Sequence, residues 1–204
     1  MLNLATIAAA ANYLRNQGTP QALLNPKPGT SAVVTALIAA EKSAKRSSTD
    51  HSLSDLNGTW KLGFITGTQK ARQQAKGALG AGRFLPQFLN IRIAYEVAEP
   101  GSDRGTVCNS VTLGPLTLTL SGPIRFYPKP SVLAFDFTHT IVTMTGVELY
   151  SGDMRGGRER AATFYDLPLK ETAFFTYFAI DERYIAARGK GGGLALWTKV
   201  SSIL

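Results

Sequence analysis

The sequence predicts a mainly β protein, an eight-stranded antiparallel barrel or half-open barrel with N-terminal helices packed on it. From Trp60 onward, the hydrophobic period changes from the helical spacing to an alternation of every second residue. Turn signals then recur at short intervals, as at Pro100-Gly101, Gly114-Pro115 and Gly189 to Gly193. Closely spaced strands without long helices between them are typical of a barrel, and eight strands can enclose one small apolar ligand.

The first fifty residues predict two helices. Leu4, Ile7 and Leu14 fall on one face of the first helix, which Gly18 and Pro20 end. The second begins at a cap formed by Thr30 or Ser31, and its apolar side carries Val33, Val34, Leu37 and Ile38. We expect residues 1–50 to be a helical appendage and residues 51–204 to be the main domain. No basic residue precedes Arg15, and no apolar run is long enough to span a bilayer, so we expect neither a signal peptide nor a transmembrane helix.

The first strand is predicted within 54–64, after a loop rich in turn formers. The other predicted strands are 87–97, 104–113, 115–126, 131–144, 171–180, 182–188 and 194–200. Leu116, Leu118 and Leu120 alternate with hydroxyl side chains, which indicates a strand with one wet face. In 131–144 the pattern predicts one face with Leu133, Phe135, Phe137, His139 and Ile141. We expect 152–160 to be a basic, glycine-rich loop.

Aromatic residues supply the candidate binding site. The run from 174 to 178 carries aromatic side chains on both faces of its strand, which is compatible with either a packed core or the lining of a pocket. The candidate ligand-binding residues are Trp60, Phe64, Phe135, Phe137, Phe174, Tyr177 and Phe178.

The charge of the chain suggests a docking surface. The formal net charge is +8, and no acidic residue lies between Asp55 and Glu96. In this stretch Lys70, Arg72, Lys76 and Arg83 are candidates for contact with a membrane or another anionic surface. The same cations would attract nucleic acid, but no RNA-binding aromatic motif accompanies them, which disfavours that partner. An ordinary solvated surface is the third interpretation.

Catalytic and metal-binding patterns are weak in this sequence. The single Cys108 excludes an intramolecular disulfide and a cysteine-rich zinc site, and two histidines cannot form a histidine-rich one. His139 has no recognisable Ser or Cys partner and fits a core position. The glycines at 189–193 lack the spacing of a phosphate-binding loop. We therefore expect a protein that is not an enzyme and has no cofactor.

Two motifs carry a resemblance to a known family. Leu56 to Phe64 (LNGTWKLGF) and Tyr184 to Lys199 (YIAARGKGGGLALWTK) are similar to the opening and closing motifs of the plastid lipid-associated protein or fibrillin family of plants and cyanobacteria. The resemblance covers about residues 30–200 and implies a lipocalin-like barrel over 51–204. The residues that match are Gly58 and Trp60 in the opening motif, and Asp181, Arg188, Gly189 and Gly192 in the closing one. We expect Gly58, Trp60 and Arg188 to close the barrel, with Arg188 stacked on Trp60.

The resemblance also implies a function. Members of that family are associated with plastoglobules and thylakoid membranes and with isoprenoids. The first hypothesis is a carrier for a carotenoid or prenylquinone on the cytoplasmic side of a cyanobacterial thylakoid membrane or on lipid droplets. The second is a coat or scaffold of lipid bodies, or of a prenylquinone-synthesis enzyme, with a filled barrel. A bilin lyase is a third, disfavoured by the lack of a catalytic group.

Overall fold

The computed structural model describes residues 2–46, 50–67 and 82–200. Its strands are β1 (Gly58–Ile65), β2 (Arg83–Phe84), β3 (Asn90–Val97), β4 (Arg104–Leu113), β5 (Leu116–Tyr127), β6 (Val132–Phe135), β7 (His139–Met144), β8 (Val147–Asp153), β9 (Ala173–Ile180), β10 (Tyr184–Gly189) and β11 (Leu194–Lys199). The α-helices are α1 (Leu2–Asn16), α2 (Thr30–Ala44) and α4 (Gly157–Thr163), and short 3-10 helices are η1 (Pro20–Leu24), η2 (Leu53–Leu56), η4 (Phe164–Asp166) and η5 (Leu169–Glu171).

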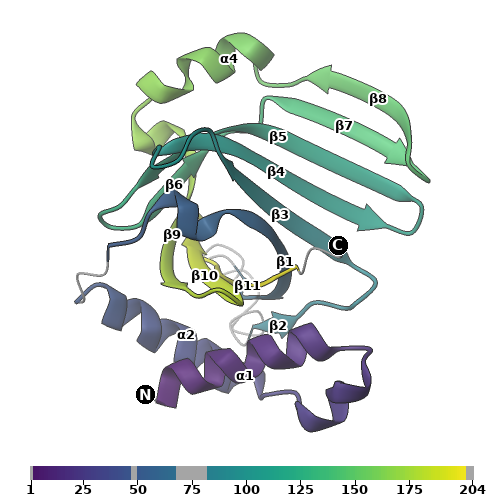
Figure 1. The fold of residues 1–204 in the computed structure, drawn as a ribbon, viewed down its shortest axis with the longest axis vertical. Helices are drawn as coiled ribbons and strands as arrows, with labels where there is room; N and C mark the ends of the chain where they lie inside the picture. Colours follow the sequence, from purple (N-terminus) through teal and green to yellow (C-terminus); the bar gives the residue numbers. More distant parts are fainter. Residues whose placement is uncertain (1, 47–49, 68–81, 201–204) are drawn as a thin grey trace. The chain divides into compact units, whose positions relative to one another are not determined.

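The strand order confirms the predicted fold class. Hydrogen-bonded neighbours follow the order β4-β3-β1-β11-β10-β9-β6-β5, and β5 pairs in turn with β4, so eight strands close into an antiparallel barrel (Figure 1). Three further strands lie off this cycle: β2 pairs with β1, while β7 and β8 extend the sheet from β5. The predicted strand positions agree closely with the observed ones, except that β2 and β8 were not predicted and that the predicted strand 131–144 is divided into β6 and β7.

Two compact units divide the chain, and their limits do not coincide with the predicted boundary at residue 50. The first unit comprises residues 1–49, 62–87 and 176–204, and the second comprises residues 50–61 and 88–175. Strands β1 and β9 pass from one unit to the other. The N-terminal helices therefore belong to the same unit as β10 and β11, and the predicted domain boundary stays a prediction.

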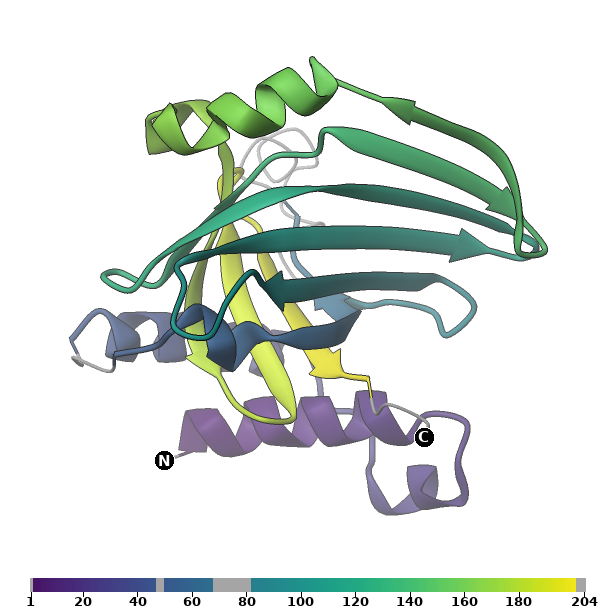
Figure 2. The same cartoon turned by 45° about the horizontal axis from the view of Figure 1, so that its top comes forward.

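In the first unit, helices α1 and α2 pack on the sheet (Figure 2). The shared core combines small side chains from the helices with larger ones from the strands; its buried members are Ile7, Ala10, Ala11, Val33, Ala36, Leu37, Ala40, Phe64, Tyr184, Ala186, Leu194 and Leu196. Alanines at the contact let helices approach a sheet closely. Helix α2 begins at Thr30 behind Gly29, so the predicted side-chain cap is absent.

In the second unit, β3, β4, β5, β7 and β8 lie side by side in one broad sheet (Figures 1 and 2). Strand β8 was not predicted, because no element was assigned to residues 145–151, and helix α4 begins within residues 152–160, which were expected to form a loop. Strand β8 pairs with β7 from Val147 to Asp153, with a bulge opposite Val142 and Thr143. Among the described helices, none combines the length and the apolar character required to cross a bilayer.

The prediction that Leu133, Phe135, Phe137, His139 and Ile141 share one face of segment 131–144 is wrong beyond Phe135. Phe135 pairs with Ile124 and His139 with Ser121, so three residues of one chain segment lie opposite two of β5. This extra residue switches the alternation, because side chains of a strand alternate strictly between the two faces. His139 consequently lies on the face opposite to that of Phe135.

Candidate functional site

The most distinctive surface of the second unit is an apolar face of its sheet. On β5 every second residue from Leu116 to Phe126 is apolar or glycine, and the directly paired residues of the neighbouring strands share that face. We call this the apolar face; it comprises Ile91, Ile93, Tyr95, Val107, Val111, Leu113, Leu116, Leu118, Leu120, Ile124, Phe126, Leu133, Phe135, Val142, Met144, Val147 and Tyr150. Only Asn109 and Thr140 interrupt it with polar side chains.

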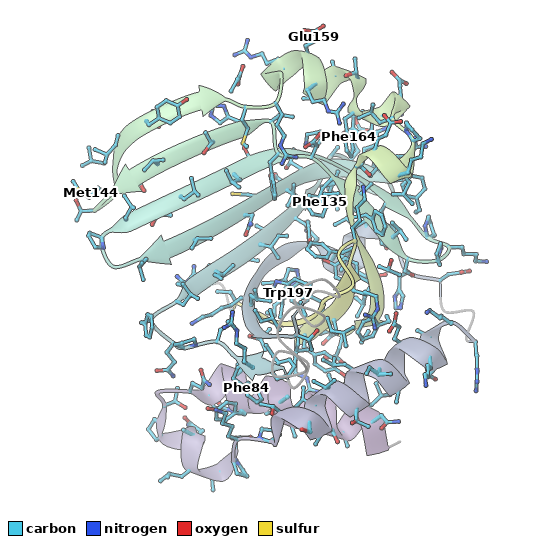
Figure 3. The ribbon with its side chains drawn as sticks, turned by 180° about the vertical axis from the view of Figure 1, so that it is seen from behind. Phe84, Phe135, Met144, Glu159, Phe164 and Trp197 are labelled. Carbon is cyan, nitrogen blue, oxygen red and sulfur yellow. The ribbon has the colours of Figure 1, made fainter. Side chains whose placement is uncertain are left out.

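Burial changes steadily along the apolar face. Ile124 and Phe126 are buried, Leu120 is half-buried, and Leu118 and Leu116 are 39% and 45% exposed. Strand β4 repeats the gradient from the buried Val107 to the exposed Leu113. Figure 3 shows Met144 at the free end of the sheet, far from Phe135 at its buried end. Large exposed apolar clusters of this kind are uncommon on proteins and mark binding surfaces.

The opposite face of the same strands is polar but uncharged over most of its length. Thr112 and Thr117 lie opposite each other and share a hydrogen bond of 3.0 Å between their hydroxyls. Thr143 and Glu148 continue this row on β7 and β8. The sheet is therefore amphipathic, with most of its apolar side chains on one face; Ile141, opposite Thr119, is an exception on the polar face.

Aromatic rings close the buried end of the apolar face. The ring of Phe135, opposite Ile124, stacks on Phe175 with 5.1 Å between centroids and contacts Phe137 at 5.4 Å. Phe174 is half-buried on β9 and, as the strand neighbour of Phe175, projects to the opposite side of the sheet. The structure thus brings together two predicted candidates, Phe135 and Phe137, and adds Phe175.

Trp60 is fully buried in the second unit. It lies opposite Ile93, and its Nε1 donates a hydrogen bond of 2.7 Å to the carbonyl of Leu56. Gly58, two residues earlier, lies opposite Tyr95 with a φ of 111°, a value that favours glycine. The opening motif is therefore a structural junction between η2 and β1.

The first unit separates its predicted candidates. Phe64 and Phe178 pack against the core shared with helices α1 and α2. Tyr177, the neighbour of Phe178 on β9, projects to the other side of the sheet and lies 6.4 Å from Trp197. Tyr177 therefore does not share a side of the sheet with Phe64 and Phe178, and the predicted binding of a ligand by these three residues stays a prediction. Trp197, which was not among the predicted binding residues, lies beside Tyr177.

Arg188 is held by a carboxylate and a carbonyl. Its Nε and Nη2 donate hydrogen bonds of 2.8 and 2.5 Å to Glu41 of α2, and its Nη1 donates one to the carbonyl of Gly192. The hydrogen bonds from Arg188 lower the pKa of the Glu41 carboxyl, although its burial acts in the opposite direction. Trp60 and Arg188 belong to different units, so their predicted stacking stays a prediction.

Of the residues predicted to contact an anionic surface, Arg83 is exposed on β2. Lys70, Arg72 and Lys76 lie outside the described residues. The proposed basic docking surface therefore stays a prediction.

His139 forms a polar cluster on the β7–β8 hairpin, contrary to its predicted core position. Its Nδ1 lies 3.2 Å from Asp153 Oδ1 and its Nε2 lies 3.1 Å from Ser151 Oγ. This is the atom order of a catalytic triad, but the Asp153 side chain is 57% exposed, whereas a triad holds its aspartate buried. We interpret the cluster as a cross-strand support for the hairpin.

Two further observations concern chemistry. Within the described ranges, no group of three or more His, Cys, Asp and Glu side chains is placed to hold a metal ion. Cys108 lies on the polar face of the sheet opposite Ser121, and burial raises the pKa of its thiol. A thiol with a raised pKa is a poor nucleophile at neutral pH.

No known protein family matches the chain, and no curated protein sequence does. Among solved structures, a redesigned β-barrel is similar to 76% of this chain over its own full length, with 12% sequence identity and a TM-score of 0.36.

Proposed function

We propose that the protein binds and carries an apolar isoprenoid lipid, a carotenoid or a prenylquinone, at the surface of a thylakoid membrane or lipid droplet of a cyanobacterium. The β-barrel fold is compatible with such a ligand-binding or carrier role. The resemblance of the two terminal motifs to the fibrillin family supports the choice of ligand class. The proposed activity is binding without covalent chemistry.

The observation that carries this proposal is the burial gradient of the apolar face. An extended hydrocarbon chain laid along β5 would contact Leu116, Leu118 and Leu120 in turn while its outer end stayed near the solvent. Burial of apolar surface contributes about 25 cal/mol per Å². A bilayer offers the same ligand a similar gain, so the net free energy of transfer is small, as a reversible carrier requires.

The test is titration of the full chain, without lipid vesicles, with a short-chain prenylquinone and a carotenoid. A quinone close to an indole quenches its fluorescence, and the chain has two tryptophans to report binding. We expect saturable binding that falls about tenfold or more in Leu118→Asp, because a charge cannot enter an apolar contact without a large desolvation cost. The matched control is Leu23→Asp, at a leucine of the first unit that is 93% exposed. Binding that is absent, or equally weakened by both variants, contradicts the proposal.

A second candidate is a coat or scaffold protein that holds no ligand, with a prenylquinone-synthesis enzyme as its partner. The packing at the buried end favours it, since the ring of Phe135 already contacts those of Phe137 and Phe175. Extraction of the protein from its native host followed by pigment and quinone analysis separates the two. Repeated recovery without lipid, together with co-purification of a synthesis enzyme, supports the scaffold.

A further inference from the structure

The free end of the apolar face consists of two neighbouring hairpin turns. The β4–β5 turn is flanked by Leu113 and Leu116, and the β7–β8 turn by Met144 and Val147. These four residues pair in one row across the sheet, in the order Leu113, Leu116, Met144 and Val147, and so point to the same face. They are between 45% and 64% exposed. We call these four residues the hairpin tips.

Apart from Glu148, which follows the tip residue Val147 and lies on the opposite, polar face of the sheet, charge is missing around the hairpin tips. The sequence contains no Lys, Arg, Asp or Glu from 105 to 124, which covers nearly all of the β4–β5 hairpin, and none from 137 to 147. A soluble surface of this length normally carries charges on its wet face, and here threonines replace them. Protein partners are usually positioned by charged or strongly polar groups at the rim of a contact, which the tips do not offer. A lipid layer, by contrast, excludes charge from its acyl region.

Some backbone polar groups of the two turns form hydrogen bonds within the protein. The amide of Thr145 donates a hydrogen bond of 2.8 Å to the carbonyl of Pro115, which joins the two turns, and the Thr145 hydroxyl donates one of 2.7 Å to the Met144 carbonyl. Backbone groups that enter a lipid layer must be hydrogen-bonded within the protein. The lateral bond therefore makes the pair of turns better suited to a lipid surface than two separate loops.

From these observations we propose that the hairpin tips insert into a lipid layer and dock the carrier on it. This inference rests on the proposed function and adds the mode of docking. Rows of side chains on one strand face are about 7 Å apart, since each residue rises about 3.3 Å. Insertion of the tips and of the next row, which includes Leu118, Val142 and Tyr150, reaches the depth of about 5–10 Å typical of interfacial binding. The apolar face would then open directly into the lipid.

Binding of the full chain to vesicles without any added ligand tests the docking separately from carriage. We expect the chain to float with zwitterionic phosphatidylcholine vesicles at low and at high salt. The variant Leu116→Ser with Met144→Ser is expected to lower the vesicle partition coefficient about tenfold or more, because it removes apolar contact with the acyl chains. The matched control, Leu23→Ser with Leu24→Ser, changes two leucines of the first unit that are 93% and 81% exposed, and is expected to have no effect.

A depth measurement complements the flotation. The native tryptophans are buried, at 0% and 4% exposure, so lipid quenchers should reach neither of them. In Leu116→Trp the new indole is expected to be quenched by lipids brominated near the headgroup end of the acyl chain, whereas in Leu23→Trp it is not.

Three results overturn the docking proposal. The first is equal loss of vesicle binding in the tip and control variants. The second is binding only to anionic vesicles at low salt, which would assign docking to basic residues. The third is an unchanged partition coefficient in the tip variant. This result overturns the proposal even if the variant reduces self-association of the chain, because the tips would then contact a second copy and not a lipid layer. Ligand binding in vesicle-free solution is unaffected by any of these, so failure of the docking mode is distinguishable from failure of the carrier function.

Discussion

Glu41 and Arg188 are 147 residues apart in the sequence and are joined by two charge-assisted hydrogen bonds of 2.8 and 2.5 Å. The pair fastens helix α2 to strand β10. The side chain of Glu41 is 11% exposed and that of Arg188 is 28% exposed, so water screens the pair only partly. The arginine of the closing motif therefore stabilises the packing of the N-terminal helices on the sheet.

Glu41→Gln is expected to lower the free energy of unfolding by about 2–3 kcal/mol, because it leaves a partly buried guanidinium without its counter-charge. Urea unfolding followed by circular dichroism measures the change. The control is Lys45→Gln, since Lys45 lies 3.6 Å from the same carboxylate but is 70% exposed. That substitution should cost less than about 0.5 kcal/mol. An equal loss of unfolding free energy in the two variants would contradict a stabilising role of the Glu41–Arg188 pair.

The same pair makes stability depend on pH. The pKa of Glu41 is lowered in the folded state by its hydrogen bonds with Arg188. Its stabilising contribution is therefore complete above the unfolded-state pKa of about 4.3 and is lost as the pH falls through the lower folded-state value. The unfolding free energies of the wild type and Glu41→Gln, measured from neutral pH into the acid range, should therefore approach each other once the pH falls below the unfolded-state value, and converge below the folded-state value. A difference that stays constant over this range contradicts the linkage.

Asp136 anchors the irregular segment between β6 and β7. Its carboxylate is buried and accepts hydrogen bonds from the amide of Phe137 and from Arg155 and Arg160, at 2.9, 3.2 and 2.9 Å. Asp136→Asn is expected to cost about 3 kcal/mol in chemical denaturation, because an amide cannot balance two guanidinium groups. Arg155→Gln should cost less than about 1 kcal/mol, as its side chain is 63% exposed.

The sequence predicts most strands here because their periodicity is local. Leu116, Leu118 and Leu120 show the alternation that the structure confirms, and the turns at Gly101 and Gly114 lie where expected. The same alternation continues to Phe126, and following it to the end of the strand would have identified the apolar face. Position along a strand does not reveal exposure, however, so the gradient from Phe126 to Leu116 required the structure.

Two features were beyond the reach of local pattern. The switch of faces after Phe135 depends on one extra residue opposite β5, and periodicity assumes that none exists. The partners of His139 lie 12 and 14 residues away on a strand whose sequence, VELYSGD, lacks a regular alternation. Both arrangements depend on long-range strand pairing, because tertiary contacts, and not local propensity, determine the register of a β-strand.

Trp60 of the opening motif has a structural role that substitution can separate into packing and hydrogen bonding. Trp60→Phe keeps an aromatic ring but removes the Nε1 donor to the Leu56 carbonyl, and should lower the free energy of unfolding by about 1–3 kcal/mol. Trp60→Ala should cost about 3–5 kcal/mol, because it also leaves a cavity. Thermal and urea unfolding of the two variants checks this order. A larger loss in the phenylalanine variant would be incompatible with a buried packing role.

Gly122 sits where the switch of faces occurs, and its replacement tests that switch directly. A Cβ added there would lie 2.2 Å from the backbone carbonyl oxygen of Asp136, so the segment between β6 and β7 would have to move. Backbone cannot yield as a flexible side chain does, and we expect Gly122→Ala to cost more than about 3 kcal/mol, the scale of an overpacked core. Gly114→Ala is the comparison, because its Cβ meets open space and only the φ of +59° opposes it, at about 1–2 kcal/mol. If Gly122→Ala unfolds at the same urea concentration as Gly114→Ala, the close approach is absent. In that case Phe135 and Thr140 need not share a face, and the switch of faces between β6 and β7 would lose its support.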